Sequence, residues 1–362
     1  MILSRRIASV IAVVVSVSCV TSAFASTSAS AKQSVSVANS PIDLTSTSGK
    51  LRGSGSTFAD RYYKAVIVNL TKKAKMIRID YRPIGSGRGK SEFGRNVTDF
   101  AGTDSLVKNT DGPKAGEYLY FPTTAAAITV AYRLNGVDDL KLSAPTIAKI
   151  FQRDVTRWND PAIAAENPDA NLPNKPIGVV HRADRSGTTS NFTKYLNTAA
   201  AGVWRLGAGD AVRWPAATSQ GDGNRRVAQI LENNNASIGY VDLANADAFG
   251  LTYAAIRNKA GVYVRPTTAG VTAALAKAQF ADDLTYQPLD ADGADSYPLT
   301  APTFILTRTS YKNQETVDLV KSLLTYILTD GQDLAVRVDY ARLPDDLRQR
   351  ALAQLDQITV GP

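Results

Sequence analysis

The strongest constraint on the fold is an alternation between short β-rich runs and helical segments, which starts at Leu51. The expected strands lie at 76–81, 126–132, 176–180, 236–241 and 303–307, and the expected helices include 58–73, 145–153 and 316–328. This alternation is typical of α/β domains with mainly parallel sheets. In such folds, ligands bind at the carboxyl ends of the strands, in the loops that open the helices.

The composition limits the kinds of site that these loops can form. The 362 residues are enough for about two domains. One His and one Cys exclude a disulfide scaffold, a zinc ribbon and a multi-His metal site, and any Cys-His or Ser-His-Asp catalysis would need Cys19 or His181. We therefore expect no metal and no cofactor. The net charge of +8 favours an acidic partner.

The N-terminal segment predicts export. Two arginines, Arg5 and Arg6, precede a short apolar run at 7–17, and a small-x-small site ends at Ala25. This is the pattern of a signal peptide, which we place at 1–25. Residues 26–50 are rich in Ser, Thr, Ala and Val without a regular period, and we interpret them as a flexible leader.

Removal of the signal peptide would change both the charge and the cysteine content. It takes away two arginines and no acid, so the exported chain carries 39 basic and 33 acidic residues, or +6. It also removes Cys19. An alternative is that the segment before Cys19 is a lipoprotein cleavage site, which would anchor the protein in a membrane through this residue.

Three loops combine glycine with Ser or Thr at expected strand-to-helix turns. They lie at 53–58, 85–89 and 182–189. Any one of them is explained by ordinary helix capping and turn chemistry. Together they offer several hydroxyls and free first-turn N–H groups, which suit an anion. Because the guanidinium of Arg182 binds oxyanions in a bidentate manner, a small tetrahedral anion is the natural ligand.

Asp104 would select among such anions if it joins the site. A carboxylate repels an anion unless the ligand brings a proton that the carboxylate can accept. Phosphate carries at least one proton at neutral pH and sulfate carries none, so Asp104 would disfavour sulfate. From its sequence context alone, Asp104 could equally be a surface turn residue.

Several separated motifs resemble the periplasmic phosphate-binding proteins that feed phosphate ABC transporters. They cover nearly everything from Leu51 to Leu347 and occur in the right order. They are Gly55-Ser56-Thr57-Phe58, Gly85-Ser86-Gly87, Asp99-Phe100 with Thr103-Asp104, Arg182-Ala183-Asp184 with Ser186-Gly187-Thr188, Arg157-Trp158-Asn159-Asp160, Ser237-Ile238-Gly239-Tyr240-Val241 and Asp339-Tyr340-Ala341-Arg342-Leu343-Pro344.

The resemblance implies a two-domain clamshell of the type II periplasmic-binding-protein class, with mixed sheets flanked by helices and a two-strand hinge. The first domain would be discontinuous, at 51–131 and 299–362, and the second would lie at 132–298. Such a protein binds phosphate in the cleft between the domains and presents it to a membrane permease without performing chemistry. The chain would be exported to the periplasm or cell surface, and its only membrane contact would be the permease or a lipid anchor.

The resemblance also implies roles for individual residues. Asp104 would accept the proton of the ligand, and Arg182 would be the charged clamp, held by Asp184. The other phosphate-binding positions would be Thr57, Phe58, Ser86, Ser186, Gly187 and Thr188. Arg88 and Arg185 stand where this family commonly has small residues, and they would either speed the capture of phosphate or admit a larger phosphorylated ligand.

Other functions remain as alternatives. The segment 85–91 looks like a nucleotide-binding loop that ends in Lys90-Ser91, but three residues separate its outer glycines where that motif needs four. A phosphatase would need more than His181, which we expect to be structural. A nucleic-acid-binding protein would need a basic stripe with aromatics. A binding protein for another oxyanion or an organophosphate, or a phosphate scavenger without a permease, stays open.

Overall fold

A computed structural model describes residues 47–108 and 112–361. The expected signal peptide at 1–25, Cys19 and most of the expected leader lie outside these residues. The expected leader was too long at its C-terminal end, because the first strand, β1, spans Gly49–Gly55. Among the residues described, no helix has the length and apolar character needed to cross a membrane.

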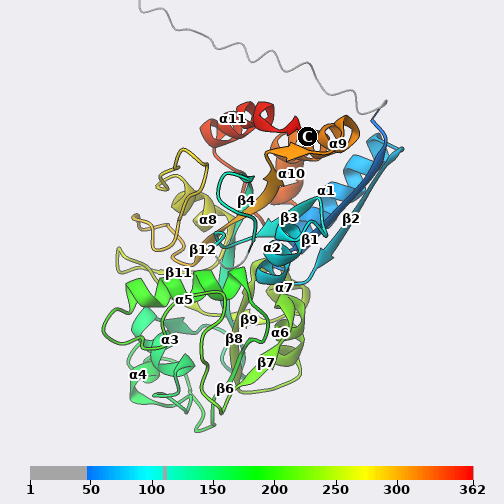
Figure 1. Cartoon of the computed structure of the whole chain (residues 1–362). Helices are drawn as coiled ribbons and strands as arrows, with labels where there is room; N and C mark the ends of the chain where they lie inside the picture. The colour runs from blue at the N-terminus through cyan, green and yellow to red at the C-terminus, as the bar shows by residue number, and fades with distance from the viewer. Residues whose placement is uncertain (1–46, 109–111, 362) are drawn as a thin grey trace, which may run out of the picture. The chain divides into compact units, whose positions relative to one another are not determined.

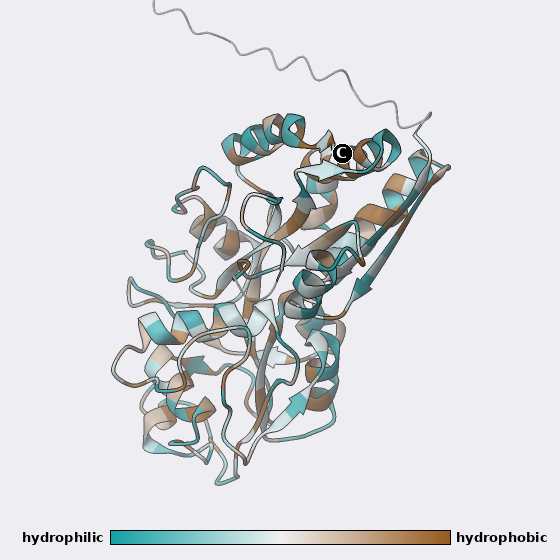
Figure 2. Cartoon of the chain, in the orientation of Figure 1, coloured by the Kyte–Doolittle hydropathy of each residue, from teal (hydrophilic) through white to brown (hydrophobic). Residues whose placement is uncertain are grey.

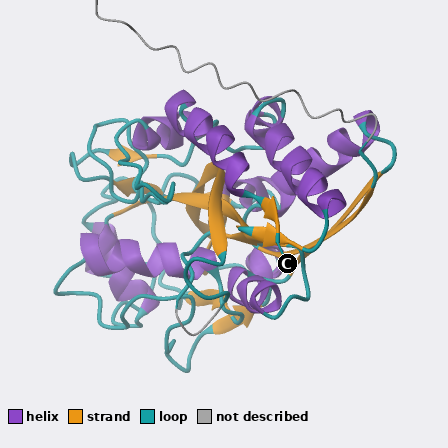
Figure 3. Ribbon diagram, turned by 45° about the horizontal axis from the view of Figure 1, so that its top comes forward, coloured by secondary structure: helices purple, strands orange, loops and turns teal. Residues whose placement is uncertain are grey.

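A nine-stranded sheet forms the centre of the fold, with helices on both sides (Figures 1 and 3). Its order is β2-β1-β3-β12-β4-β8-β6-β7, and β9 also pairs with β4. The further strands are β2 (Ile77–Pro83), β3 (Phe100–Thr103), β4 (Tyr118–Arg133), β6 (Gly178–Arg182), β7 (Ser219–Gly221), β8 (Ser237–Asp242), β9 (Thr252–Tyr253) and β12 (Thr300–Arg308). Two small sheets are formed by β5 (Lys141–Leu142), β10 (Ala255–Arg257) and β11 (Tyr263–Val264), and by β13 (Ser310–Tyr311) and β14 (Thr359–Val360).

The strand β4 belongs to both halves of this sheet. Its residues from Tyr118 to Ala127 pair with β12, and those from Ile128 to Arg133 pair with β8. Both long strands run antiparallel to their neighbours, whereas β1 pairs with β2 and β3, and β6 with β7 and β8, in parallel. The expectation of mainly parallel sheets was therefore wrong, because strand and helix periodicity does not report direction. The mixed sheets expected for a clamshell are present.

The expected strand at 126–132 is only the second half of β4. Residues from Tyr120 to Tyr132 are all buried, so the strand shows no alternation between polar and apolar residues. Pro122 lies in its first half and lacks the N–H that a central strand uses. The pairing with β12 shifts by one residue there, since Thr303 pairs with Thr124 and Phe304 with Pro122. A β-bulge thus accommodates Pro122, whose presence in the sequence argues against a central strand at this position.

Helices cover both faces of the sheet and bury the apolar sides that face it (Figure 2). In the first half, α1 and α9 pack against β2 and β1, and in the second half α6 packs against β6 and β8. The helices are α1 (Asp60–Lys73), α2 (Ser86–Gly94), α3 (Ala144–Phe151), α4 (Pro161–Ala164), α5 (Gly187–Ala199), α6 (Gly223–Glu232), α7 (Leu243–Ala248), α8 (Thr268–Leu275), α9 (Gln314–Leu328), α10 (Gly331–Val336) and α11 (Asp345–Gln354). The three helices expected from the sequence correspond to α1, α3 and α9, within two residues at each end.

The expected division into domains at 51–131, 132–298 and 299–362 stays a prediction, since the described residues pack into one compact unit. One part of the expected second domain contacts the first. Tyr286 packs against Phe304 of β12 with ring centroids 5.4 Å apart, and Arg350 of α11 donates to the carbonyl of Ala281 at 2.6 Å. The segment around 281–286 therefore belongs by its contacts with the half that contains β12.

Candidate anion-binding site

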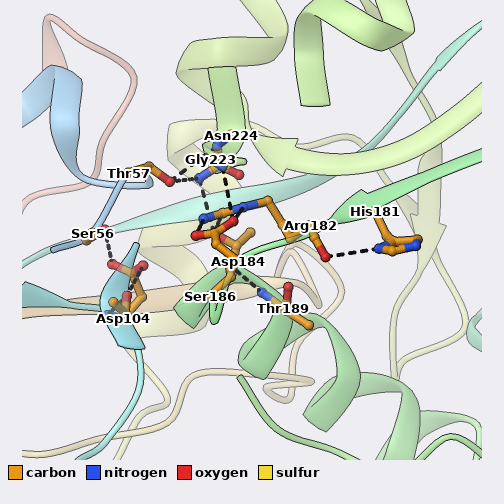
Figure 4. Close-up of polar contacts among 12 residues, drawn as sticks. Ser56, Thr57, Asp104, His181, Arg182, Asp184, Ser186, Thr189, Gly223 and Asn224 are labelled. Atoms are coloured by element: carbon orange, nitrogen blue, oxygen red, sulfur yellow. Dashed lines mark hydrogen bonds and ion pairs between the residues drawn. The ribbon is translucent and has the colours of Figure 1, made fainter. Parts of the chain in front are cut away.

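The three glycine-containing loops meet where the two halves of the sheet face each other. Thr57 follows β1, Ser86 opens α2 and Asp104 follows β3, all in the first half. Arg182 ends β6 and Ser186 caps α5 in the second half. Figure 4 shows the side chains of Asp104 and Arg182, with those of Ser56, Thr57, Asp184 and Asn224 and the backbone of Gly223 around them.

Asp104 is a buried carboxylate on the side of the first half. It is 2% exposed, and its two carboxylate oxygens accept hydrogen bonds from Ser56 Oγ at 2.6 Å and from Ser86 Oγ at 3.1 Å. Burial raises the pKa of Asp104 to about 6, against the lowering effect of these hydrogen bonds and of the charge of Arg182. Asp104 is thus a desolvated carboxylate that gains from accepting a hydrogen bond from a ligand that carries a proton.

Arg182 is fixed by a carboxylate on its own loop. Its Nε and Nη2 donate to the two oxygens of Asp184 at 2.7 and 2.5 Å, and Nη1 donates to Thr188 Oγ1 at 3.3 Å. Asp184 also accepts from the backbone N–H of Gly223 at 3.1 Å. Burial acts to raise the pKa of Asp184, but Arg182 and Gly223 more than offset it and the net shift is downward. The guanidinium is therefore oriented and neutralised on one edge.

Ser186 and Gly187 place the start of α5 directly against Asp104. Ser186 Oγ accepts from the N–H of Thr189 at 3.1 Å, which is a normal N-cap. A Cβ atom at Gly187 would lie 2.6 Å from Ser86 Oγ and 2.7 Å from Asp104 Oδ2, so only glycine fits this close approach. Asn191, one turn further along α5, donates to the backbone carbonyl of Asp104 at 2.6 Å.

Further hydrogen bonds join the two halves around the site. Thr57 Oγ1 accepts from the N–H of Asn224, at the start of α6, at 3.2 Å. The N–H of Gly87 donates to the carbonyl of Arg185 at 3.0 Å. Because Ser86, Asp104, Arg182, Ser186 and Thr188 are all at most 3% exposed, the site is closed off from solvent in this conformation.

All the expected site residues lie in this region, but not all in the same way. Phe58 has a fully buried ring packed edge-on against Tyr340, and its carbonyl accepts from the hydroxyl of Tyr340, so its side chain serves the core. Thr57 is only partly buried, and its hydroxyl accepts hydrogen bonds from Asn224. His181 is hydrogen-bonded through both ring nitrogens, to Arg182 O and Thr218 Oγ1, as expected of a structural histidine.

Sequence reasoning missed Ser56, Gly223 and Asn224. Ser56 lies inside the motif at 55–58, but the resemblance implies its neighbour Thr57 as the phosphate-binding residue there. Asn224 Nδ2 donates to Thr57 at 3.3 Å and to Thr188 at 3.1 Å, and so bridges the halves. The run 221–226 stands out in the sequence only by its glycines and arginines, which gave no signal for Asn224.

Two cavities open at the edge of the cleft, outside the buried residues. One of about 540 Å³ is lined by Arg88, Arg185, Asp184 and Gly223, among others. The other, of about 710 Å³, is lined by Arg61, Arg225, Asp222 and Asp339, among others, and shares Thr57 with the first. Arg88 and Arg185 thus lie at the mouth of the cleft. Across 47–108 and 112–361, no group of three or more His, Cys, Asp or Glu residues could hold a metal ion.

A family model described as a PBP superfamily domain matches residues 42–331. The phosphate-binding protein PstS of Pasteurella multocida (strain Pm70) is 34% identical over 322 residues, which are 87% of this chain and 92% of that protein. Phosphate-binding protein PstS 3 of Mycobacterium tuberculosis (strain CDC 1551 / Oshkosh) is 34% identical over 325 residues, which are 85% and 86% of the two chains.

Solved structures agree in fold. A high-affinity periplasmic phosphate-binding protein, PfluDING, solved with phosphate, has a TM-score of 0.70 at 20% identity and covers 84% of this chain and 94% of its own. A putative phosphate ABC transporter substrate-binding protein from Clostridium perfringens, also solved with phosphate, has a TM-score of 0.62 at 19% identity, with 82% and 100% covered. At this identity, the likeness concerns the fold, which is the α/β fold of periplasmic phosphate-binding proteins.

Proposed function

The chain belongs to the family of PstS-type phosphate-binding proteins, and on this premise we propose that it binds inorganic phosphate in the cleft and delivers it to an ABC permease for import. The observation that carries the proposal is Asp104, a buried carboxylate held by Ser56 and Ser86 on the far side of the cleft from Arg182. This pair provides an acceptor for the proton of the ligand and a cation for its charge.

The other expected positions complete the site in this proposal. Thr57, Ser86, Ser186 and Thr188 contribute hydroxyl or backbone donors, Phe58 and Gly187 contribute backbone N–H groups, and Asp184 orients Arg182. The start of α5 adds the positive end of a helix dipole. An anion with a substituent would meet the closed walls around Asp104, so the proposed ligand is a free oxyanion and not a phosphate ester.

Release and capture require the two halves to separate. The proposed movement is a hinge opening between 51–131 with 299–362 and 132–298, at β4 and at the chain segment before β12, and the segment around 281–286 would move with β12 because of its contacts. The protein acts by binding, without catalysis, and is exported to the periplasm or cell surface. The hydrogen bonds from Asn224 to Thr57 and from Gly87 to Arg185 are interactions that such an opening would break.

Isothermal titration with phosphate, arsenate and sulfate tests the proposed ligand. We expect phosphate and arsenate to bind and sulfate to bind far more weakly. Asp104→Asn should weaken phosphate binding about 10- to 100-fold, because a hydrogen bond to a charged acceptor is lost, and should improve sulfate binding because the repulsion is removed. Asp80→Asn, an exposed aspartate on β2, is the matched control and should change neither.

Tight sulfate binding by the unmodified protein would contradict the proposed role of Asp104. Delivery is tested separately, by phosphate uptake in cells that lack the chromosomal copy of the gene. The unmodified gene should restore uptake at low phosphate and the Asp104→Asn gene should not. Restoration by both would contradict the proposed link between cleft binding and import.

A further inference from the structure

Lys90 lies near the end of the segment 85–91, which looks like a nucleotide-binding loop in the sequence, but its side chain does not enter the anion site. It lies on α2 and is completely buried. Its Nζ donates to Ser105 Oγ and to the carbonyl of Leu106, both at 3.0 Å, and both on the loop that follows Asp104. These two contacts hold Lys90 within the first half of the molecule. Ser105 directly follows Asp104, the proposed proton acceptor.

The third contact of Lys90 crosses to the other half. Nζ lies 2.9 Å from Oδ2 of Asp210, which is 2% exposed and lies in the connection between α5 and β7. The backbone carbonyl of Asp210 accepts from the N–H of Ser186, the N-cap of α5, at 2.8 Å. Asp210 is therefore attached to the loop that supplies the proposed phosphate donors, although it does not contribute a donor itself.

A buried ion pair between two parts that separate differs from one within a single core. The two charges lose their hydration only when the parts come together, and their attraction then compensates that loss. If one partner is removed, the other remains a buried charge that has lost this attraction in the closed form, whereas water can solvate it in the open form. The cost of the substitution is thus confined to the closed conformation.

We propose that Lys90 and Asp210 form a closure latch, a buried ion pair between the two halves that sets how long the closed form lasts and hence how slowly the anion is released. The inference rests on the proposed function for its ligand. The latch touches no ligand atom in this scheme, and both residues are positioning residues. They act through the lifetime of the closed state, since affinity scales with the fraction of molecules able to close.

The test compares Lys90→Met, Asp210→Asn and the double variant by stopped-flow with inorganic phosphate. Each single variant should raise the dissociation rate constant about tenfold or more and leave the association rate constant within about threefold. The double variant should release phosphate more slowly than the product of the two single effects predicts, because the second substitution removes the buried charge whose attraction the first one took away. The control is Lys259→Met, which removes an exposed pair with Asp292 at a similar 2.8 Å and should change nothing.

Two further measurements separate a latch from a merely structural pair and from the choice of ligand. The melting temperature of the phosphate-free single variants should stay within a few degrees of the unmodified protein. Spin labels on cysteines at positions 95 and 205, in a Cys19→Ser background, should report more of the longer distances in the single variants. This distance measurement tests the latch even if the unmodified protein does not bind phosphate, a result that would reject only the proposed function.

Unchanged dissociation rates together with an unchanged distance distribution would overturn the latch. So would a fall in the melting temperature of the phosphate-free single variants that matches their loss of affinity, because the pair would then support the fold in general. A double variant whose effect equals the product of the single effects would also overturn it, since the two residues would then act independently.

Discussion

At the scale of single residues, the molecule contains a second buried carboxylate that the anion site does not use. Asp242 is fully buried at the end of β8 and caps α7, where its oxygens accept from the N–H and the side-chain amide of Asn245. Burial, and to a smaller extent the charge of Asp104, raises its pKa from 3.8 to about 7 against the lowering effect of these hydrogen bonds. Between about pH 4 and pH 7, the folded protein therefore holds a proton here that the unfolded chain releases.

This carboxylate predicts how stability depends on pH. Its pKa is higher in the folded state, so its contribution is fully present below about pH 4 and is lost as the pH rises to about 7. Asp242→Asn keeps a capping side chain without a charge. In urea unfolding without phosphate, we expect the variant to come within about 1 kcal/mol of the unmodified protein at pH 4.5 and to exceed it at pH 8 by up to about 4 kcal/mol. Equal differences at both pH values would contradict this.

At the scale of elements, a substitution at Gly187, the first residue of α5, should affect the stability of the protein and the closing of its two halves differently. Alanine suits a helix better than glycine by roughly 0.5 to 1 kcal/mol, so Gly187→Ala should leave the phosphate-free protein as stable as before or slightly more stable. Its Cβ would collide with Ser86 and Asp104 in the closed conformation described above, and the proposed opening would relieve that collision. We expect phosphate affinity in calorimetry to fall at least about tenfold. Unchanged affinity would show that the halves need not approach so closely.

Some elements could be predicted from the sequence and others could not. The starts of α2 and α5 were predicted as anion-binding turns from their glycines and hydroxyls, which are local signals. Strand β1 was not predicted, because 49–55 is rich in glycine and lacks β-branched residues. It is a strand because β2 and β3 pair with it on both sides. Asn224 was not predicted either, because its role depends on contacts to Thr57 and Thr188, which are far from it in the chain.

At the scale of the whole molecule, positive charge at the cleft mouth should guide the anion. Arg88 and Arg185 are exposed and line the same cavity next to Thr57. Arg185→Gln should lower the association rate constant for phosphate roughly two- to fivefold at low salt and reduce its dependence on salt, with little change in dissociation. Stopped-flow at several ionic strengths measures both. The control is Arg95→Gln, at an exposed arginine beyond the end of α2. An equal effect of this control would mean that the association rate depends on the net charge of the protein and not on the position of Arg185.

The sharing of the sheet between distant segments has a consequence for the order of folding. The strand β12 lies between β3 and β4, and Thr303 bonds across to Thr103, 200 residues earlier. The half that contains β1 to β3 cannot be completed until β12 is available, whereas β6, β7 and β8 lie within one shorter stretch of chain. Because long loops must close before distant contacts form, the half with β6 to β8 should form first.

Pulsed hydrogen exchange during refolding should therefore protect the amides of β6 and β8 before those of β1 and β3. Simultaneous protection would mean that both halves fold as one unit. A chain that is synthesised from its N-terminus thus starts the half that bears Asp104 first and finishes it last, so its earliest strands must wait for nearly the whole sequence before they can acquire their central partner.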